Sequence, residues 1–132
     1  MDALPPGALG LPRSRRIKQG RDFARAKLQG RRLAQGCLIL NWVVPLQGST
    51  SRLGVITGRR IGEAVVRTRA RRLLREAFRL NQPHLSEAVD MVLVARPSIV
   101  GKRSGEVADD FVAALKKARL YREVNFPNPN AD

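Results

Sequence analysis

The sequence is poor in the residues that most enzymes use for chemistry. It has one cysteine, Cys37, and one histidine, His84, among 132 residues. A disulfide framework and a thiolate metal cluster are therefore excluded, and a single imidazole leaves little for metal ligation or acid–base catalysis. Most acidic side chains fall in expected first turns of helices or in terminal segments, where capping and solvation explain them. Because hydrolase, metalloprotease and nucleotide-binding motifs are also missing, the sequence predicts no catalytic or metal site in the protein itself.

Long apolar runs and aromatic side chains are also scarce. No stretch approaches the about 18 apolar residues of a transmembrane helix, and aromatic residues make up 5% of the chain. In residues 1–16 the basic side chains follow a weak apolar part, which is the reverse of the order in a secretory signal peptide. The sequence therefore predicts a cytoplasmic protein without a membrane partner.

Positive charge dominates what is present. Lysine and arginine total 25 against 11 acidic residues, which gives a formal net charge of +14. Such a charge opposes compaction by self-repulsion, and a polyanionic partner relieves it. Arginine far outnumbers lysine, and a planar guanidinium suits bidentate contact with phosphate. Nucleic acid is therefore the expected partner.

Residues 59–80 hold eight arginines and two acids. Apolar side chains recur there at helical spacing, which predicts one amphipathic helix that follows a tight basic connection at residues 58–62 and runs to about Leu80, with this inner face: Val66, Ala70, Leu73, Leu74, Ala77 and Leu80. A stripe of arginines at every fourth position runs along another side, and Glu76 is placed to relieve Arg72. Since like charges four residues apart repel, a ridge of one sign favours nucleic-acid binding over a merely solvated face. A preceding strand and few Asn or Gln side chains for base reading favour RNA over DNA.

Shorter patterns predict the remaining elements. Residues 17–28 are expected to form a helix that Asp22 caps and Gly30 ends. Residues 37–45 and 52–57 have strand composition and are expected to pair as an antiparallel hairpin. Residues 90–95 suit a strand buried on both faces, and a last helix is expected to start near Ser104. Together they predict an α+β sandwich, with one domain at residues 16–121 between flexible tails at 1–15 and 122–132.

The order of residues from Gly58 to Arg79, GRRIGEAVVRTRARRLLREAFR, closely resembles the signature of the bacterial ribonuclease P protein family. Further similarity covers Asp22 and Phe23 in the first helix, the strand before this motif, and DMVLVARP at residues 90–97 after it. The resemblance implies a two-layer sandwich in the order α-β-β-β-α-β-α, similar to ribosomal-protein RNA-binding domains. It also implies a left-handed crossover between the last two strands, against the usual right-handed rule.

The resemblance also implies a function. Ribonuclease P removes the 5′ leader from precursor tRNA, and its RNA subunit carries the active site and the Mg²⁺ ions. One protein per RNA helps to bind the substrate and stabilises the active RNA, and the protein alone is not catalytic. Eight residues would face the RNA subunit: Arg59, Arg60, Arg67, Thr68, Arg69, Arg71, Arg72 and Arg75. A cleft between the first helix and the sheet would hold the single-stranded leader, with Phe23 as a stacking wall and with Lys27, Ile39 and Asn41 beside it.

The chain departs from the family pattern at four positions. Glu63 and Thr68 replace usual asparagines, and Lys27 and Asn41 stand where aromatic residues often lie. We therefore expect weaker stacking, stronger phosphate attraction, little base preference and a steep salt dependence. Phe23 has an alternative role in the core, where most phenylalanines lie. The alternative function is that of a structural RNA-binding protein, such as a ribosomal component or an RNA chaperone, and a DNA-binding regulator comes third.

Overall fold

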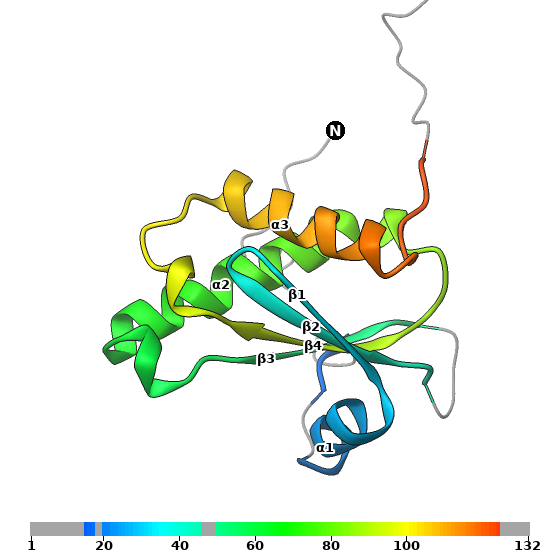
Figure 1. Cartoon of the computed structure of the whole chain (residues 1–132), viewed down its shortest axis with the longest axis horizontal. Helices are drawn as coiled ribbons and strands as arrows, with labels where there is room; N and C mark the ends of the chain where they lie inside the picture. Colours follow the sequence, from blue (N-terminus) through cyan, green and yellow to red (C-terminus); the bar gives the residue numbers. More distant parts are fainter. Residues whose placement is uncertain (1–14, 18–19, 46–49, 125–132) are drawn as a thin grey trace, which may run out of the picture.

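The computed structural model describes residues 15–17, 20–45 and 50–124. Its main elements follow the order that the family resemblance implies (Figure 1): α1 (Gly20–Gln29), β1 (Arg31–Gln35), β2 (Leu38–Val43), β3 (Arg52–Ile56), α2 (Ala64–Asn81), β4 (Asp90–Ala95) and α3 (Ser104–Lys117). Short 3₁₀ segments connect them: η3 (Arg59–Ile61), η4 (Gln82–His84) and η5 (Pro97–Ile99). The predicted α+β class is confirmed.

The four strands form one sheet in the order β1-β2-β4-β3. β2 pairs antiparallel with β1 and β4, whereas β3 pairs parallel with β4. The predicted hairpin between residues 37–45 and 52–57 is therefore wrong, because β4 lies between those two strands. A parallel pair needs a crossover connection, and α2 supplies it. The left-handed sense of this crossover stays a prediction.

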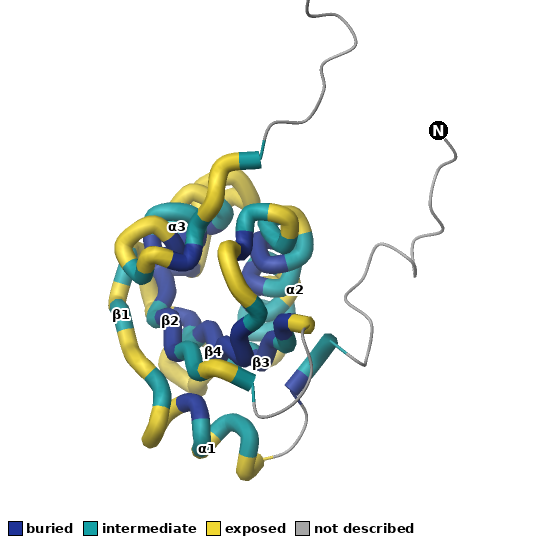
Figure 2. Tube along the Cα trace, turned by 90° about the vertical axis from the view of Figure 1, so that its right-hand side faces the viewer, coloured by how far each residue is buried: buried dark blue, intermediate teal, exposed yellow. Residues whose placement is uncertain are grey.

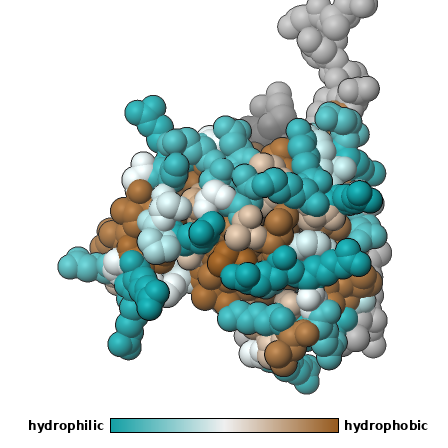
Figure 3. All heavy atoms as spheres, viewed as in Figure 1, coloured by the Kyte–Doolittle hydropathy of each residue, from teal (hydrophilic) through white to brown (hydrophobic). Residues whose placement is uncertain are grey.

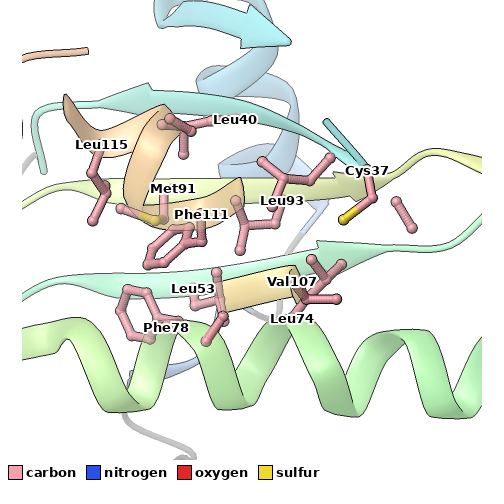
Figure 4. Close-up of a cluster of buried hydrophobic side chains, with 14 of the residues drawn as sticks. Cys37, Leu40, Leu53, Leu74, Phe78, Met91, Leu93, Val107, Phe111 and Leu115 are labelled. Carbon is pink, nitrogen blue, oxygen red and sulfur yellow. The ribbon is translucent and has the colours of Figure 1, made fainter. Parts of the chain in front are cut away.

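The helices lie on both faces of the sheet. α2 and α3 cover one face, and α1 lies across the other (Figures 1 and 2). The larger core fills the space under α2 and α3, where fully buried side chains such as Phe78, Phe111 and Leu93 meet (Figure 4). A smaller cluster of Ile17, Ala26 and Val92 lies under α1. β4 contributes to both clusters, which confirms the prediction that it is buried on both sides.

The start of α1 and the inner face of α2 differ from those predicted. α1 begins at Gly20, so Asp22 lies in its first turn rather than at its cap, and its Oδ2 is 3.6 Å from Arg52 Nη1. The predicted tight connection before the long helix is present: η3 ends at Ile61, and Gly62, whose φ is 141°, separates it from α2. The inner face of α2 also differs, since Phe78 is fully buried and Leu80 is 55% exposed. Phe78 follows buried Leu74 by one helical turn, so the face turns toward it rather than toward Leu80.

The turn between β1 and β2 is fastened to α3. Cys37, expected in a strand, lies in this turn, where its backbone N–H donates to Asp110 Oδ2 at 2.9 Å. Burial, together with Asp110, raises the pKa of the Cys37 thiol to about 12. Gly36 has a φ of 54°, and a Cβ there would lie 2.2 Å from Asp110 Oδ2, so the turn requires glycine.

The predicted tails fall mostly outside the described residues. At their inner ends, Arg15 donates from Nε to the Ser51 carbonyl at 2.8 Å, and the Arg122 amide donates to the His84 carbonyl at 2.7 Å. Contacts with the domain therefore reach one residue beyond each predicted boundary, and the flexibility of the tails stays a prediction.

Candidate nucleic-acid interface

The predicted RNA-facing arginines divide into an exposed set and a half-buried set. Arg59, Arg60, Arg69 and Arg72 are exposed, and we call them the arginine face. Within the described residues, none of these four forms an ion pair with a carboxylate. The charge of this face is therefore available to a polyanion.

The acidic residue of α2 does not relieve the arginine face. Glu76 binds Arg79 through two contacts of 2.5 and 3.3 Å, so the predicted relief of Arg72 by Glu76 is wrong. Glu63 is exposed at the N-cap of α2 and makes no capping hydrogen bond through its side chain. Its carboxylate is the one negative charge of residues 59–80 that no arginine of the described chain pairs with.

One of the half-buried arginines, Arg71, is held by neutral partners. Arg71 donates from Nη1 to Thr57 Oγ1 at 2.8 Å and from Nη2 to Thr68 Oγ1 at 3.1 Å. Thr68 therefore orients an arginine, and its side chain is itself half-buried. The Nε of Arg67 is buried and has no hydrogen-bond partner among the described residues. The Arg71 guanidinium is therefore fixed in direction next to the end of β3, and no carboxylate of the described residues compensates its charge.

A hollow of about 330 Å³ lies beside β3, and two arginines meet over it. Arg75 comes from α2, and Arg16 comes from the segment that bridges β3 at Leu53, where the Ile17 N–H donates to the Leu53 carbonyl at 2.8 Å. Burial and the neighbouring charges of Arg16 and Arg71 lower the pKa of Arg75. The Arg16 Nε is buried without a hydrogen-bond partner in the described chain. Two neighbouring arginines and no acidic residue line this hollow, so it is suited to an anion.

Phe23 forms one wall of this hollow, which we call the Phe23 hollow: Arg16, Ile17, Phe23, Leu53, Gly54, Val55 and Arg75. The ring lies on the backbone of Gly54, since a Cβ there would be 2.6 Å from Phe23 Cε1. The ring also packs against the smaller core cluster under α1. Phe23 thus packs partly in the core and partly forms the wall of the hollow, and its stacking on a base stays a prediction.

The other predicted cleft residues do not line the Phe23 hollow. Lys27 is exposed on α1, and Ile39 is half-buried on β2. Asn41 is 4% exposed, so its side chain is covered. Sequence reasoning missed Arg16, although it lies in a basic segment. Nothing in the local pattern indicates that residue 16 pairs with a strand so much later in the chain.

Other kinds of site find no support among the described residues. They contain no group of three or more His, Cys, Asp or Glu side chains that could hold a metal ion. No helix within them is long and apolar enough to cross a membrane. A helix-covered sheet with uncompensated arginines along one helix and one strand edge defines a nucleic-acid-binding α+β domain.

Comparison with known proteins specifies the family. The ribonuclease P family model matches residues 11–119. The ribonuclease P protein component of Chloroflexus aurantiacus is 38% identical over 109 residues, which cover 82% of this chain and 80% of the relative. That of Clostridium kluyveri is 33% identical over 109 residues, covering 81% and 96%. The chain belongs to the ribonuclease P protein family, the protein components of a tRNA-processing ribonucleoprotein.

Solved structures agree with this assignment. The RNase P protein of Staphylococcus aureus superposes with a TM-score of 0.74 at 25% identity, over 82% of this chain and 98% of that one. The RNase P protein from Thermotoga maritima has the same fold, with a TM-score of 0.70 at 24% identity over 77% and 96%. The predicted family and fold are therefore confirmed.

Proposed function

We propose that this chain is the protein subunit of a ribonuclease P holoenzyme. It binds the catalytic RNA subunit through the arginine face and the 5′ leader of precursor tRNA at the Phe23 hollow. The RNA subunit carries the active site and its Mg²⁺ ions, one protein binds each RNA, and the complex works in the cytoplasm. The observation that supports this proposal is the set of arginines without acidic partners. Family membership indicates which enzyme the chain belongs to, and these side chains indicate where it contacts RNA.

The arginine face suits a folded RNA. Arg59 and Arg60 precede α2, and Arg69 and Arg72 follow on the helix, so their guanidinium groups can reach successive phosphates of a backbone. The N-terminal N–H groups of α2 add positive potential between them. Glu63 lies at the same end and opposes phosphate attraction there. Contacts of this kind recognise shape and charge, which is how proteins bind folded RNA.

The Phe23 hollow suits a single-stranded leader. Arg16 and Arg75 can bind a phosphate, and the exposed part of the Phe23 ring can stack on a base. Neither contact reads base identity, because guanidinium–phosphate contacts carry no sequence information and every base has a π-face. The lining of the hollow contains no general acid, general base or nucleophile. Its role is therefore to hold substrate while the RNA subunit cleaves it, with Lys27 and Ile39 farther along the leader's path.

The salt dependence of binding to the RNA subunit tests the arginine face. Contact with about six phosphates predicts roughly a 10³-fold loss of affinity between 50 and 200 mM salt. Arg60→Ala and Arg72→Ala should each weaken binding and lower the magnitude of the slope of log K against log salt by about 1. Lys117→Ala is the matched control, because Lys117 is an exposed cation on α3, and its slope should equal that of the unaltered chain. A flat response, or equal effects of all three substitutions, would contradict the proposal.

A further inference from the structure

An apolar groove lies where η5 meets the first turns of α2. Val65, Val66 and Ala70 line it from α2, and Ile99 of η5 and the following Val100 line it as well, around a volume of about 260 Å³. Val65 and Val100 are 81% and 51% exposed, which is unusual for valine. Figure 3 shows apolar atoms at this place, at the left of the molecule, with hydrophilic side chains projecting beside them. We call this feature the valine groove.

Cations surround the valine groove. Arg69 lines it, and its Nη2 donates to the Lys102 carbonyl at 2.8 Å, so this guanidinium spans from α2 to the segment after η5. Arg72 is exposed one turn after Arg69, and η3, which carries Arg59 and Arg60, contacts η5. The groove is therefore an apolar slot within the arginine face.

This charge decides between possible occupants. A second copy of the chain would bring another net charge of +14 toward the same arginines, and the repulsion would oppose a symmetric contact. An RNA brings the opposite charge, and its unpaired bases combine apolar faces with flanking phosphates. The groove is also slightly smaller than the roughly 300 Å³ at which pockets for drug-sized ligands begin, so it suits one ring system rather than a helix.

We propose that the valine groove receives one unpaired nucleobase of the RNA subunit. The base lies between Val65 and Val100, and the phosphates on either side of it contact Arg69 and Arg72. This inference rests on the proposed function for its partner, but it adds a contact that charge alone does not provide. It predicts a part of the binding energy that salt does not screen.

Two valine substitutions test this contact without changing any charge. The double variant Val65→Ser and Val100→Ser should bind the RNA subunit about 10-fold more weakly, as expected when a base loses the apolar surface that it buries against two valines. Its salt slope should equal that of the unaltered chain, since every arginine remains. Val44→Ser is the matched control, because Val44 is also 63% exposed but lies outside the arginine face, and it should bind normally. A melting temperature for each variant shows that the fold is kept.

A thiol placed in the groove gives an independent measurement. Cys37 is fully buried, so Val100→Cys creates the one accessible thiol among the described residues. The bound RNA subunit should slow its alkylation by a maleimide at least 10-fold, and a thiol from Val44→Cys should react at the same rate with and without RNA.

The outcomes separate this inference from the proposed function. If the unaltered chain does not bind the RNA subunit, the proposed function fails and the inference fails with it. If the chain binds but the double serine variant binds equally well, the inference alone is overturned, even where the thiol is protected, because RNA would then cover the groove without entering it. Protection that depends on protein concentration and not on RNA would also overturn it, in favour of a second copy of the chain.

Discussion

Replacement of the Phe23 ring separates its contribution to folding from its contribution to substrate binding. Complete truncation of a buried phenylalanine costs about 3–5 kcal/mol. Phe23 is only half-buried, so Phe23→Ala should cost about 2 kcal/mol, which lowers the melting temperature by roughly 8 °C for a domain of this size. It should also remove the stacking wall, which is worth about 1–3 kcal/mol per base, or about 5- to 150-fold in affinity for the leader.

Phe23→Leu isolates the second effect. Leucine keeps most of the apolar contact with Gly54 and the small core, so the stability cost should stay below about 1.5 kcal/mol. It has no aromatic face, so the loss of leader affinity should approach that of Phe23→Ala. Phe111→Leu is the matched control, because Phe111 is fully buried in the larger core, and it should lose stability without losing leader affinity.

The assay compares two substrates. Fluorescence anisotropy measures the affinity of the reconstituted holoenzyme for precursor tRNA and for mature tRNA, and the ratio of the two isolates the leader. Both Phe23 variants should lower this ratio, and Phe111→Leu should not. A Phe23→Leu protein that binds precursor tRNA as tightly as the unaltered chain would refute stacking at Phe23, whatever its stability.

Three further predictions concern the fold that holds these sites. Asp90 is 2% exposed and binds Arg52 through contacts of 3.0 and 2.7 Å, so Asp90→Asn should lower the free energy of unfolding by about 2 kcal/mol in urea; an unchanged midpoint would refute this. Gly36→Ala should lower the free energy of unfolding by at least about 1 kcal/mol, because the left-handed φ and a carboxylate oxygen 2.2 Å from the new Cβ both disfavour a side chain. Gly58→Ala is the control and should be nearly neutral, since its Cβ would meet nothing within 4 Å. Equal losses for the two variants would contradict this prediction. The pKa of Cys37 is raised from 9.0 to about 12, so between these values the unfolded chain releases a proton that the folded chain keeps, and stability should fall as pH rises through this window. Cys37→Ala should lose less stability than the unaltered chain over the same window, and identical pH profiles would contradict the assignment.

Much of the fold follows from local patterns, and the errors arise where distant segments meet. β4 is apolar on both faces, so its central place could be predicted. β1 has the sequence RRLAQ, which carries little strand preference, and it forms because β2 offers it an edge to pair with. The predicted hairpin was wrong because strand pairing also depends on which edges are available in the folded sheet. β4 pairs with the edge of β2 that residues 52–57 would otherwise have used.

In the candidate site, too, some features follow from local patterns and others depend on contacts between distant residues. The basic character of Arg59 to Arg75 could be predicted from charge and spacing alone. Local spacing did not indicate that Glu76 pairs with Arg79, because a side chain that can reach either of two arginines settles by rotamer and packing. The meeting of Arg16 with Arg75 depends on a bridge between the N-terminal segment and β3. Such contacts join residues far apart in the chain, so the periodicity of the sequence does not predict them.

Cleavage of precursor tRNA by the reconstituted complex tests directly whether this chain is the protein subunit of a ribonuclease P. The RNA subunit is incubated with precursor tRNA at a low Mg²⁺ concentration, alone and with a stoichiometric amount of this protein, and release of the 5′ leader is followed with time. We expect the protein to raise the rate of cleavage at low Mg²⁺, and we expect no leader release by the protein without RNA. Arg60→Ala and Arg72→Ala should weaken the stimulation, and Lys117→Ala should not. A rate that the protein leaves unchanged would contradict the claim.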